Sequence, residues 1–170
     1  MSQAPLAEIY RSVSGIIVRR LPLKETGLSG LGFKDTRRKP TEKLYLLVKK
    51  PRKNHAWQFP QGGQEKNETA AEAALRELRE ECGSDLKVNL VDNSAIGVYQ
   101  YKFPAKFVAS RKRKDGSIGA KVITIIGADW ISGQCQPDGE EIIDFAWLTQ
   151  QELTEYIDDD YKEAINPFLL

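Results

Sequence analysis

The stretch RELREECG, residues 76–83, carries the side chains best suited to chemistry. Glu77, Glu80 and Glu81 fall within five residues of one another. A helix turns by about 100° per residue, so the three carboxylates would lie within about 100° of each other on one face. Like charges at this spacing destabilise an isolated helix by roughly a few tenths of a kcal/mol per pair. The pattern therefore indicates either a cation held among the carboxylates or a solvated strip softened by neighbouring arginines.

A helix over residues 70–82 is expected to hold these glutamates. Thr69 and Glu72 form the capping-box pattern T-x-x-E, and Gly83 is a natural C-terminal stop. Apolar residues at helical spacing predict a buried stripe, made of Ala71, Ala74, Leu75, Leu78 and Cys82. The glutamates should lie on the neighbouring face, carried by a packed helix rather than by a flexible tail.

The rest of the chain predicts strands before and after this helix. Strands are expected over residues 12–20, 43–50, 93–104, 120–131 and 140–149, with a basic hairpin tip around Asp115 and Gly116. Two further helices are expected, over residues 150–156 and 161–168. The Gly- and Pro-rich segment 21–42 reads as a long connection. This order predicts one α/β domain spanning residues 1–170, with a mixed β-sheet sandwiched between α-helices.

Composition and single residues exclude several function classes. The chain of 170 residues is 41% hydrophobic and 29% charged, which is ordinary for a folded soluble protein. No apolar run approaches the ~18 residues needed to span a bilayer, so no membrane association is expected. Cys82 and Cys135 lack partners at ligand spacing and read as reduced thiols. Histidine-based catalysis would depend on His55 alone, in a turn-like segment.

The charge of the chain is divided unevenly along its length. Residues 1–130 carry 24 Lys and Arg against 14 Asp and Glu, whereas residues 131–170 carry one Lys against ten acids. Two basic clusters stand out and are expected to contact RNA or an acidic partner: Lys49, Lys50, Arg52 and Lys53, and Arg111, Lys112, Arg113 and Lys114. The alternative is that these are separate solvated loops, because a cluster in sequence need not form a surface patch.

Read from Gly62, the chain follows the pattern G-x5-E-x7-R-E-L-x-E-E-x-G. Its eight matched positions are Gly62, Glu68, Arg76, Glu77, Leu78, Glu80, Glu81 and Gly83. This segment, residues 62–84, resembles the Nudix box. The one departure is Ser84, where the family usually has an aliphatic residue, which concerns packing after the helix. The resemblance implies a Nudix fold.

The resemblance also implies a metal-dependent hydrolysis of a nucleoside diphosphate linked to another group. Mg²⁺ or Mn²⁺ would be held by Glu77, Glu80 and Glu81 with the carbonyl of Gly62, in keeping with the oxygen ligands that hard cations prefer. The metals would activate the attacking water. Arg76 would orient a glutamate, and Glu68 would hold the loop to the helix. The lead-in WQFPQGG is most similar to members acting on dinucleoside polyphosphates or RNA 5′ ends.

A second resemblance covers most of residues 12–170. The segments KLYLLVKK, IGVYQYKFP and DFAWLTQQELTEYIDDDYKEAINPFLL together resemble the Nudix-fold protein of the mitochondrial large ribosomal subunit. That resemblance implies a structural component of a mitochondrial ribosome, with ribosomal RNA and ribosomal proteins as partners and an intact box that binds metal. The alternative is an active pyrophosphohydrolase with a nucleotide substrate, no stable partner and a cytoplasmic location. The intact glutamates favour the alternative, since animal and fungal ribosomal members have usually lost them.

Overall fold

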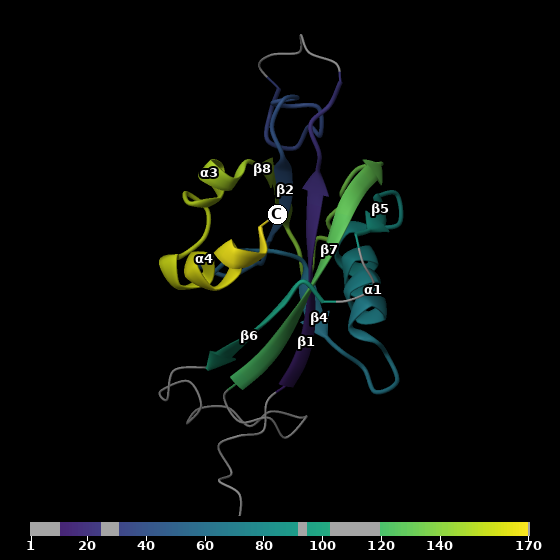
Figure 1. Ribbon diagram of the computed structural model, residues 1–170, viewed down its shortest axis with the longest axis vertical. Helices are drawn as coiled ribbons and strands as arrows, with labels where there is room; N and C mark the ends of the chain where they lie inside the picture. Colours follow the sequence, from purple (N-terminus) through teal and green to yellow (C-terminus); the bar gives the residue numbers. More distant parts are fainter. Residues whose placement is uncertain (1–10, 25–30, 92–94, 103–119, 170) are drawn as a thin grey trace, which may run out of the picture.

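A computed structural model describes residues 11–24, 31–91, 95–102 and 120–169 of the chain. Its strands form one mixed sheet with helices on both sides (Figure 1). The strands β1 (Arg11–Arg20) and β7 (Ala120–Ser132) run parallel along the centre, and the other pairings are antiparallel. The predicted α/β architecture with a sandwiched mixed sheet is confirmed.

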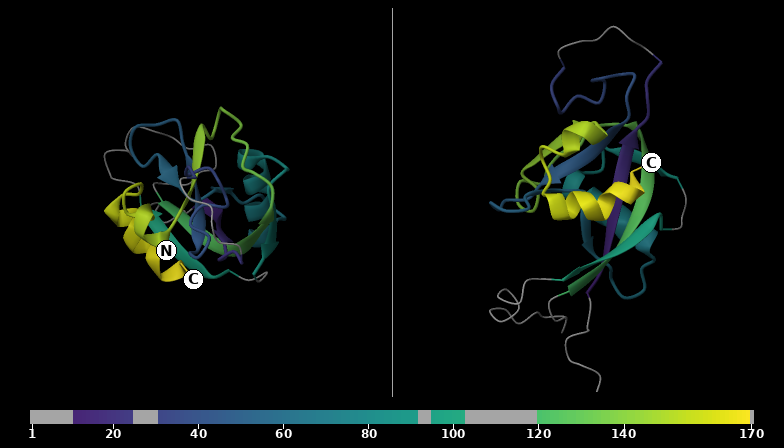
Figure 2. Two further views of the ribbon diagram at one scale, coloured as in Figure 1. Left: turned by 90° about the horizontal axis from the view of Figure 1, so that it is seen from above. Right: turned by 60° about the vertical axis from the view of Figure 1, so that its left-hand side comes forward.

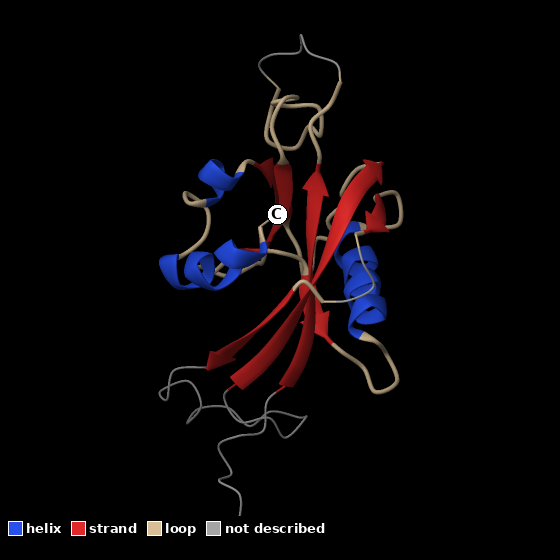
Figure 3. Ribbon diagram, in the orientation of Figure 1, coloured by secondary structure: helices blue, strands red, loops and turns tan. Residues whose placement is uncertain are grey.

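The remaining strands surround this central pair. They are β2 (Leu44–Lys49), β3 (Trp57–Gln58), β4 (Gln61–Gly63), β5 (Lys87–Leu90), β6 (Gly97–Lys102) and β8 (Asp144–Leu148). The strand β2 pairs with β1, β3 and β8, while β7 pairs with β1, β5 and β6. Figure 3 shows the strands spreading apart from the centre of the sheet. The helices lie on opposite sides of this sheet.

Alternation along β2 divides the interior into two cores. Leu44, Leu46 and Val48 face the helix α1 (Ala70–Cys82), whereas Tyr45 and Leu47 face the C-terminal helices. Successive residues of a strand point to opposite faces, so a run of apolar residues fills both cores at once. The sequence interpretation of residues 43–50 as a central strand is therefore confirmed.

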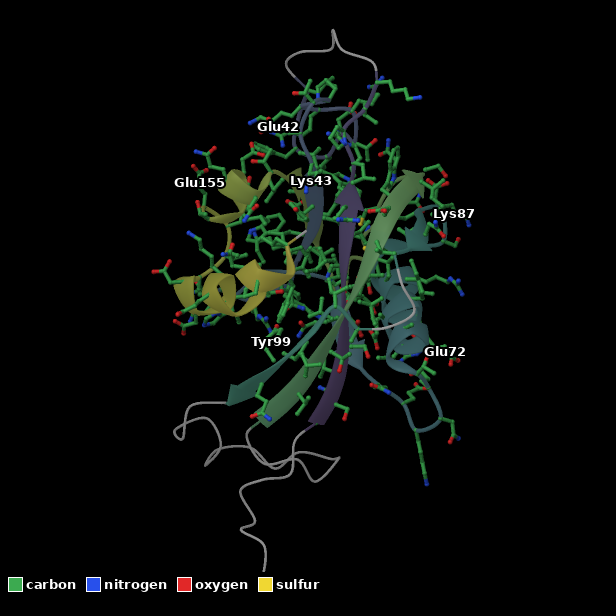
Figure 4. The ribbon with its side chains drawn as sticks, viewed as in Figure 1. Glu42, Lys43, Glu72, Lys87, Tyr99 and Glu155 are labelled. Atoms are coloured by element: carbon green, nitrogen blue, oxygen red, sulfur yellow. The ribbon has the colours of Figure 1, made fainter. Side chains whose placement is uncertain are left out.

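The helix α1 begins and ends as its sequence predicts. The Thr69 hydroxyl accepts a hydrogen bond from the Glu72 N–H, and the Glu72 carboxylate accepts one from the Thr69 N–H. Glu72 lies at the outer surface of the helix (Figure 4). Gly83 ends the helix with φ +83°, a left-handed value that favours glycine. Both termini are thus satisfied within the chain, and α1 can pack rigidly on the sheet.

The opposite face is covered by α3 (Gln150–Leu153), α4 (Asp159–Ile165) and the 3₁₀-helix η2 (Asn166–Phe168), which lie together in both views of Figure 2. The predicted helix 150–156 is shorter than expected, since turns follow Leu153. Among the described residues no helix has both the length and the apolar content that a bilayer crossing needs. The expected hairpin tip at Asp115 and Gly116 lies outside the described residues.

A buried arginine holds the described residues 36–42 of the long connection after β1. Arg20 is fully buried, and its guanidinium donates to the backbone carbonyls of Thr36, Arg38, Lys39 and Glu42. A buried charge is tolerated only when its donors are satisfied, which these carbonyls provide. These bonds tie residues 36–42 to the end of β1.

Candidate active site

Two glutamates of the box lie on the inner side of α1, against β4. Glu77 is only 8% exposed and Glu81 is fully buried. A Cβ atom built on Gly62 would lie 2.0 Å from the Glu77 carboxyl carbon. Glycine at this position therefore leaves the space that the Glu77 carboxylate occupies. The sequence predicted that these glutamates lie on the face of α1 beside the buried stripe. Both side chains are more deeply buried than that prediction implied.

Glu81 lacks the partners that a buried carboxylate needs. By hydrogen-bond geometry neither of its oxygens has a well-placed donor among the described residues, and the nearby backbone of Gln61 offsets its burial only in part. Burial raises the pKa of Glu81 to about 8, although the positive charge of Lys50 acts in the opposite direction. A buried polar group without partners costs roughly 1–3 kcal/mol, and more when it is charged. Such a group fits a site that a cation completes.

Arg76 ties the helix to the loop that precedes it. Its guanidinium donates to both carboxylate oxygens of Glu68, at 2.7 and 2.9 Å, and to the carbonyl of Gly63 at 2.9 Å. It also donates to Glu77 at 3.0 Å. Two parallel charge-assisted bonds fix the geometry of an arginine and a carboxylate. Arg76 and Glu68 thus lie where they can hold the loop and orient Glu77.

Glu80 lies apart from the other two glutamates. Its side chain is 53% exposed and pairs with Arg76 at 3.2 Å. Glu80 follows Arg76 by four residues, so the two side chains are neighbours on the helix surface and can pair. Its negative charge still acts on the site, because burial first and then Glu80 raise the pKa of Glu77. Metal binding by Glu80 stays a prediction.

A third carboxylate joins Glu77 and Glu81 from a distant part of the chain. Ligand oxygens of Glu77, Glu81 and Glu141 all lie within 4.8 Å of one another. Glu141 lies in the loop between β7 and β8, about sixty residues from Glu81, and is exposed. No spacing in the sequence relates it to the box, so sequence reasoning missed it. The fold brings it to the site because the loop between β7 and β8 passes the end of α1, where the Gln136 N–H donates to the Cys82 carbonyl, before β8 pairs with β2.

These three residues fit a hard divalent cation. Carboxylate oxygens are the ligands that Mg²⁺ prefers, and Mn²⁺ accepts the same oxygen donors. A cation would favour the ionised form of Glu81, offset the negative charge of the three carboxylates and supply a partner for the buried oxygens of Glu81. The geometry therefore supports a metal centre built from two helical glutamates and one loop glutamate.

The basic cluster 49–53 is partly engaged within the fold. Lys49 lies over the Trp57 ring, and the charge of Lys50 acts on Glu81. Arg52 donates to the His55 carbonyl and to Gln58. Lys53 is exposed. Contact of this cluster with RNA or a partner stays a prediction, as does contact by Arg111 to Lys114, which lie outside the described residues.

The other candidate residues lie outside this metal centre. His55, with φ +51°, pairs with Asp158 and so joins the loop after β2 to the start of α4. Cys82 and Cys135 are free and buried, and the Cys135 thiol acts on the pKa of Cys82. Cys135, and then burial, raise the pKa of Cys82 far above its usual range, so this thiol is an unreactive part of the core.

Part of the chain is similar in sequence to curated RNA pyrophosphohydrolases. The chain is 38% identical over 79 residues to an RNA pyrophosphohydrolase of Campylobacter jejuni subsp. doylei, covering 46% of this chain and 49% of that protein. It is 43% identical over 72 residues to an RNA pyrophosphohydrolase of Halorhodospira halophila, covering 40% and 36%. The chain thus spans about half or less of the length of these relatives. The resemblance to a mitochondrial ribosomal protein finds no support among them.

Solved structures extend the likeness to the whole fold. An Ap4A hydrolase of C. elegans in a binary complex superposes with a TM-score of 0.61 at 17% identity, covering 93% of this chain and 94% of that chain. A dihydroneopterin triphosphate pyrophosphohydrolase of E. coli reaches 0.58 at 15% identity, covering 95% and 98%. The NUDIX domain model matches residues 34–168, which include the capped helix and all three carboxylates of the metal centre. The chain belongs to the Nudix domain family.

Proposed function

We propose that this chain is a metal-dependent Nudix pyrophosphohydrolase that acts on the 5′ end of RNA. The observation that carries the proposal is the cluster of Glu77, Glu81 and Glu141, in which the buried oxygens of Glu81 have no well-formed hydrogen bond to the described residues. The similarity to RNA pyrophosphohydrolases over 79 residues supports the substrate class. This favours the enzyme over the structural ribosomal role, which gains no supporting observation.

Bound Mg²⁺ or Mn²⁺ would neutralise phosphate charge and lower the pKa of an attacking water. Glu77 and Glu81 would hold the cation from α1, and Glu141 would complete the donor set from the loop. Arg76 would keep Glu77 in place through its fixed pairing with Glu68. Water would attack a phosphorus atom of a 5′-triphosphate RNA and break the anhydride bond between its α- and β-phosphates. The products would be a 5′-monophosphate RNA and pyrophosphate.

A second substrate class is favoured by the fold comparison. The superposition on an Ap4A hydrolase makes a dinucleoside polyphosphate the alternative substrate. Both substrates present an anhydride between phosphates to the same metal centre. The difference must therefore come from the loops that surround the site.

The test is hydrolysis of matched substrates by the purified chain with Mg²⁺ or Mn²⁺. The panel is a 5′-triphosphate RNA oligonucleotide, the same oligonucleotide with a 5′-monophosphate, and diadenosine tetraphosphate. We expect conversion of the triphosphate RNA, loss of turnover in Glu81→Gln, and normal turnover in Glu155→Gln. Glu155 is an exposed glutamate just after α3 (Figure 4) and serves as the matched control. Turnover of diadenosine tetraphosphate alone would favour the second substrate class, and no turnover of either would contradict the proposal.

A further inference from the structure

The loop that carries Glu141 contains a turn built around one carboxylate oxygen. The Oδ1 atom of Asp138 accepts hydrogen bonds from the backbone N–H groups of Glu140, Glu141 and Ile142, at 3.1, 3.0 and 2.9 Å. The turn is closed by the Gly139 N–H, which donates to the Ile142 carbonyl at 2.9 Å. Aspartate is favoured in turns because its short side chain can accept from the following backbone in this way.

The loop is fixed to the rest of the fold before this turn. The Gln134 N–H donates to the Asp85 carboxylate at 2.9 Å, and the Gln136 N–H donates to the Cys82 carbonyl at 2.7 Å. Cys82 directly follows Glu81 on α1. The loop is thus attached to the helix that carries the first two glutamates.

The loop is also fixed after the turn. The Ile143 N–H donates to the Lys49 carbonyl at 2.9 Å, and Ile142 is fully buried. With both ends held, the conformation of the segment from Asp138 to Ile142 decides where the Glu141 side chain lies. Gly139 has φ +82°, so this turn uses a backbone conformation that few other residues adopt.

We propose that Asp138 is a positioning residue for Glu141, holding the turn that brings this glutamate to Glu77 and Glu81. The inference rests on the proposed metal centre and adds the residue that preorganises its loop ligand. Asp138 is not one of the three clustered carboxylates, and its Oδ1 already accepts three hydrogen bonds. Its role is therefore exerted through the backbone of Glu141 and not by contact with the cation.

The experiment measures Mn²⁺ affinity by titration of the purified chain. The variants are Asp138→Ala, Asp138→Asn, Glu141→Gln and the double variant Asp138→Ala with Glu141→Gln. Glu140→Gln is the control, because it removes a carboxylate from the same exposed turn. Residues that orient a metal ligand typically change metal affinity by about 10–100-fold. We expect Asp138→Ala to lose about 10-fold or more, and Glu140→Gln to stay within about twofold of wild type.

Two features separate positioning from a general structural or electrostatic effect. Asp138→Asn should restore most of the affinity, since an amide oxygen can accept the same three N–H groups. Asp138→Ala should add no further loss in the Glu141→Gln background, because it acts through that residue. A second readout needs no metal: amide hydrogen exchange of Glu140, Glu141 and Ile142 should accelerate in Asp138→Ala and stay unchanged in Glu141→Gln.

Three results of the affinity measurements would overturn the inference. They are an Asp138→Ala affinity within twofold of wild type, an equal loss with and without Glu141, and a failure of Asp138→Asn to restore binding. Unchanged exchange of the turn amides would overturn it as well. If wild type binds Mn²⁺ but hydrolyses no substrate, the proposed function fails while the role of Asp138 stands on affinity and exchange. If wild type binds no Mn²⁺, both fail.

Discussion

At the scale of single residues, Gly62 and Glu77 form a pair in which the absence of one side chain makes room for the other. The Glu77 carboxylate fills the volume that a Cβ atom on Gly62 would need. The sequence suggested that Gly62 is needed so that its carbonyl can approach a cation. The structure gives a second reason, which is steric and acts on the ligand itself.

Gly62→Ala should therefore displace Glu77, destabilise the fold and weaken metal binding. Overpacking of a well-filled site costs roughly 1–3 kcal/mol. Gly32→Ala is the matched control, since a Cβ atom at Gly32 would meet nothing within 4 Å. Urea unfolding of both variants, with and without Mn²⁺, measures the effect. Equal stabilities of the two variants would show that Glu77 can move aside freely.

The residues of the site were predictable to the extent that they share one helix. Helical periodicity relates Glu77 to Glu81 directly, so their common face could be inferred from the box. Glu141 could not be inferred, because its approach depends on how β7 and β8 are placed in the sheet. The deep burial of Glu81 also depends on β4, which the sequence shows only as a short segment with two glycines.

At the scale of elements, α1 was the most predictable part of the fold. Its capping box, its glycine stop and its apolar stripe all act locally, and the observed bounds Ala70–Cys82 agree with the prediction. The strand β5 was not predicted, because an alternation over only four residues is too short to mark a strand and its pairing with β7 is a tertiary contact. The helix after Thr149 ended early for a similar reason, since its capping box fixes the start but nothing fixes the end.

Leu78→Ala should destabilise the domain through the core beneath α1. Leu78 is 4% exposed and packs with the residues of β1 and β2 that face this helix. Truncation of a buried leucine costs roughly 2–5 kcal/mol, because the cavity fills only in part. Arg79→Ala, on the exposed face of the same helix, should change the free energy of unfolding by less than about 0.5 kcal/mol. A loss of similar size in both would mean that this face of α1 is not the packed one.

At the scale of the whole molecule, Glu152 of α3 joins the C-terminal helices to the long connection through ion pairs with Arg38 and Lys39. Arg38 donates to both carboxylate oxygens of Glu152, at 2.8 and 2.7 Å, and to the carbonyl of Trp147. The hydrogen bonds from Arg38 hold the pKa of Glu152 at about 2, well below its usual value. The pair is therefore a link whose strength depends on pH.

A carboxyl group with a lowered pKa in the folded state stabilises the fold when it is ionised. This contribution is complete above about pH 4.5 and is lost as the pH falls toward 2. A difference of about 2.5 pKa units corresponds to roughly 3 kcal/mol as an upper bound. Glu152→Gln should thus lower stability at pH 7 and flatten its dependence on pH between 4.5 and 2. Denaturant unfolding across this range tests the prediction, and a slope identical to wild type would contradict it.

If Glu77, Glu81 and Glu141 form a divalent-cation site, added metal should raise the melting temperature of the folded protein. A cation that binds only the folded state at 100 times its Kd stabilises by about 2.7 kcal/mol, which raises the Tm of a domain of this size by several degrees. Wild type and Glu155→Gln should both show this rise with Mg²⁺ or Mn²⁺, and Glu81→Gln should show none. A wild-type Tm that ignores both metals, or a Glu81→Gln variant that responds like wild type, would contradict the account.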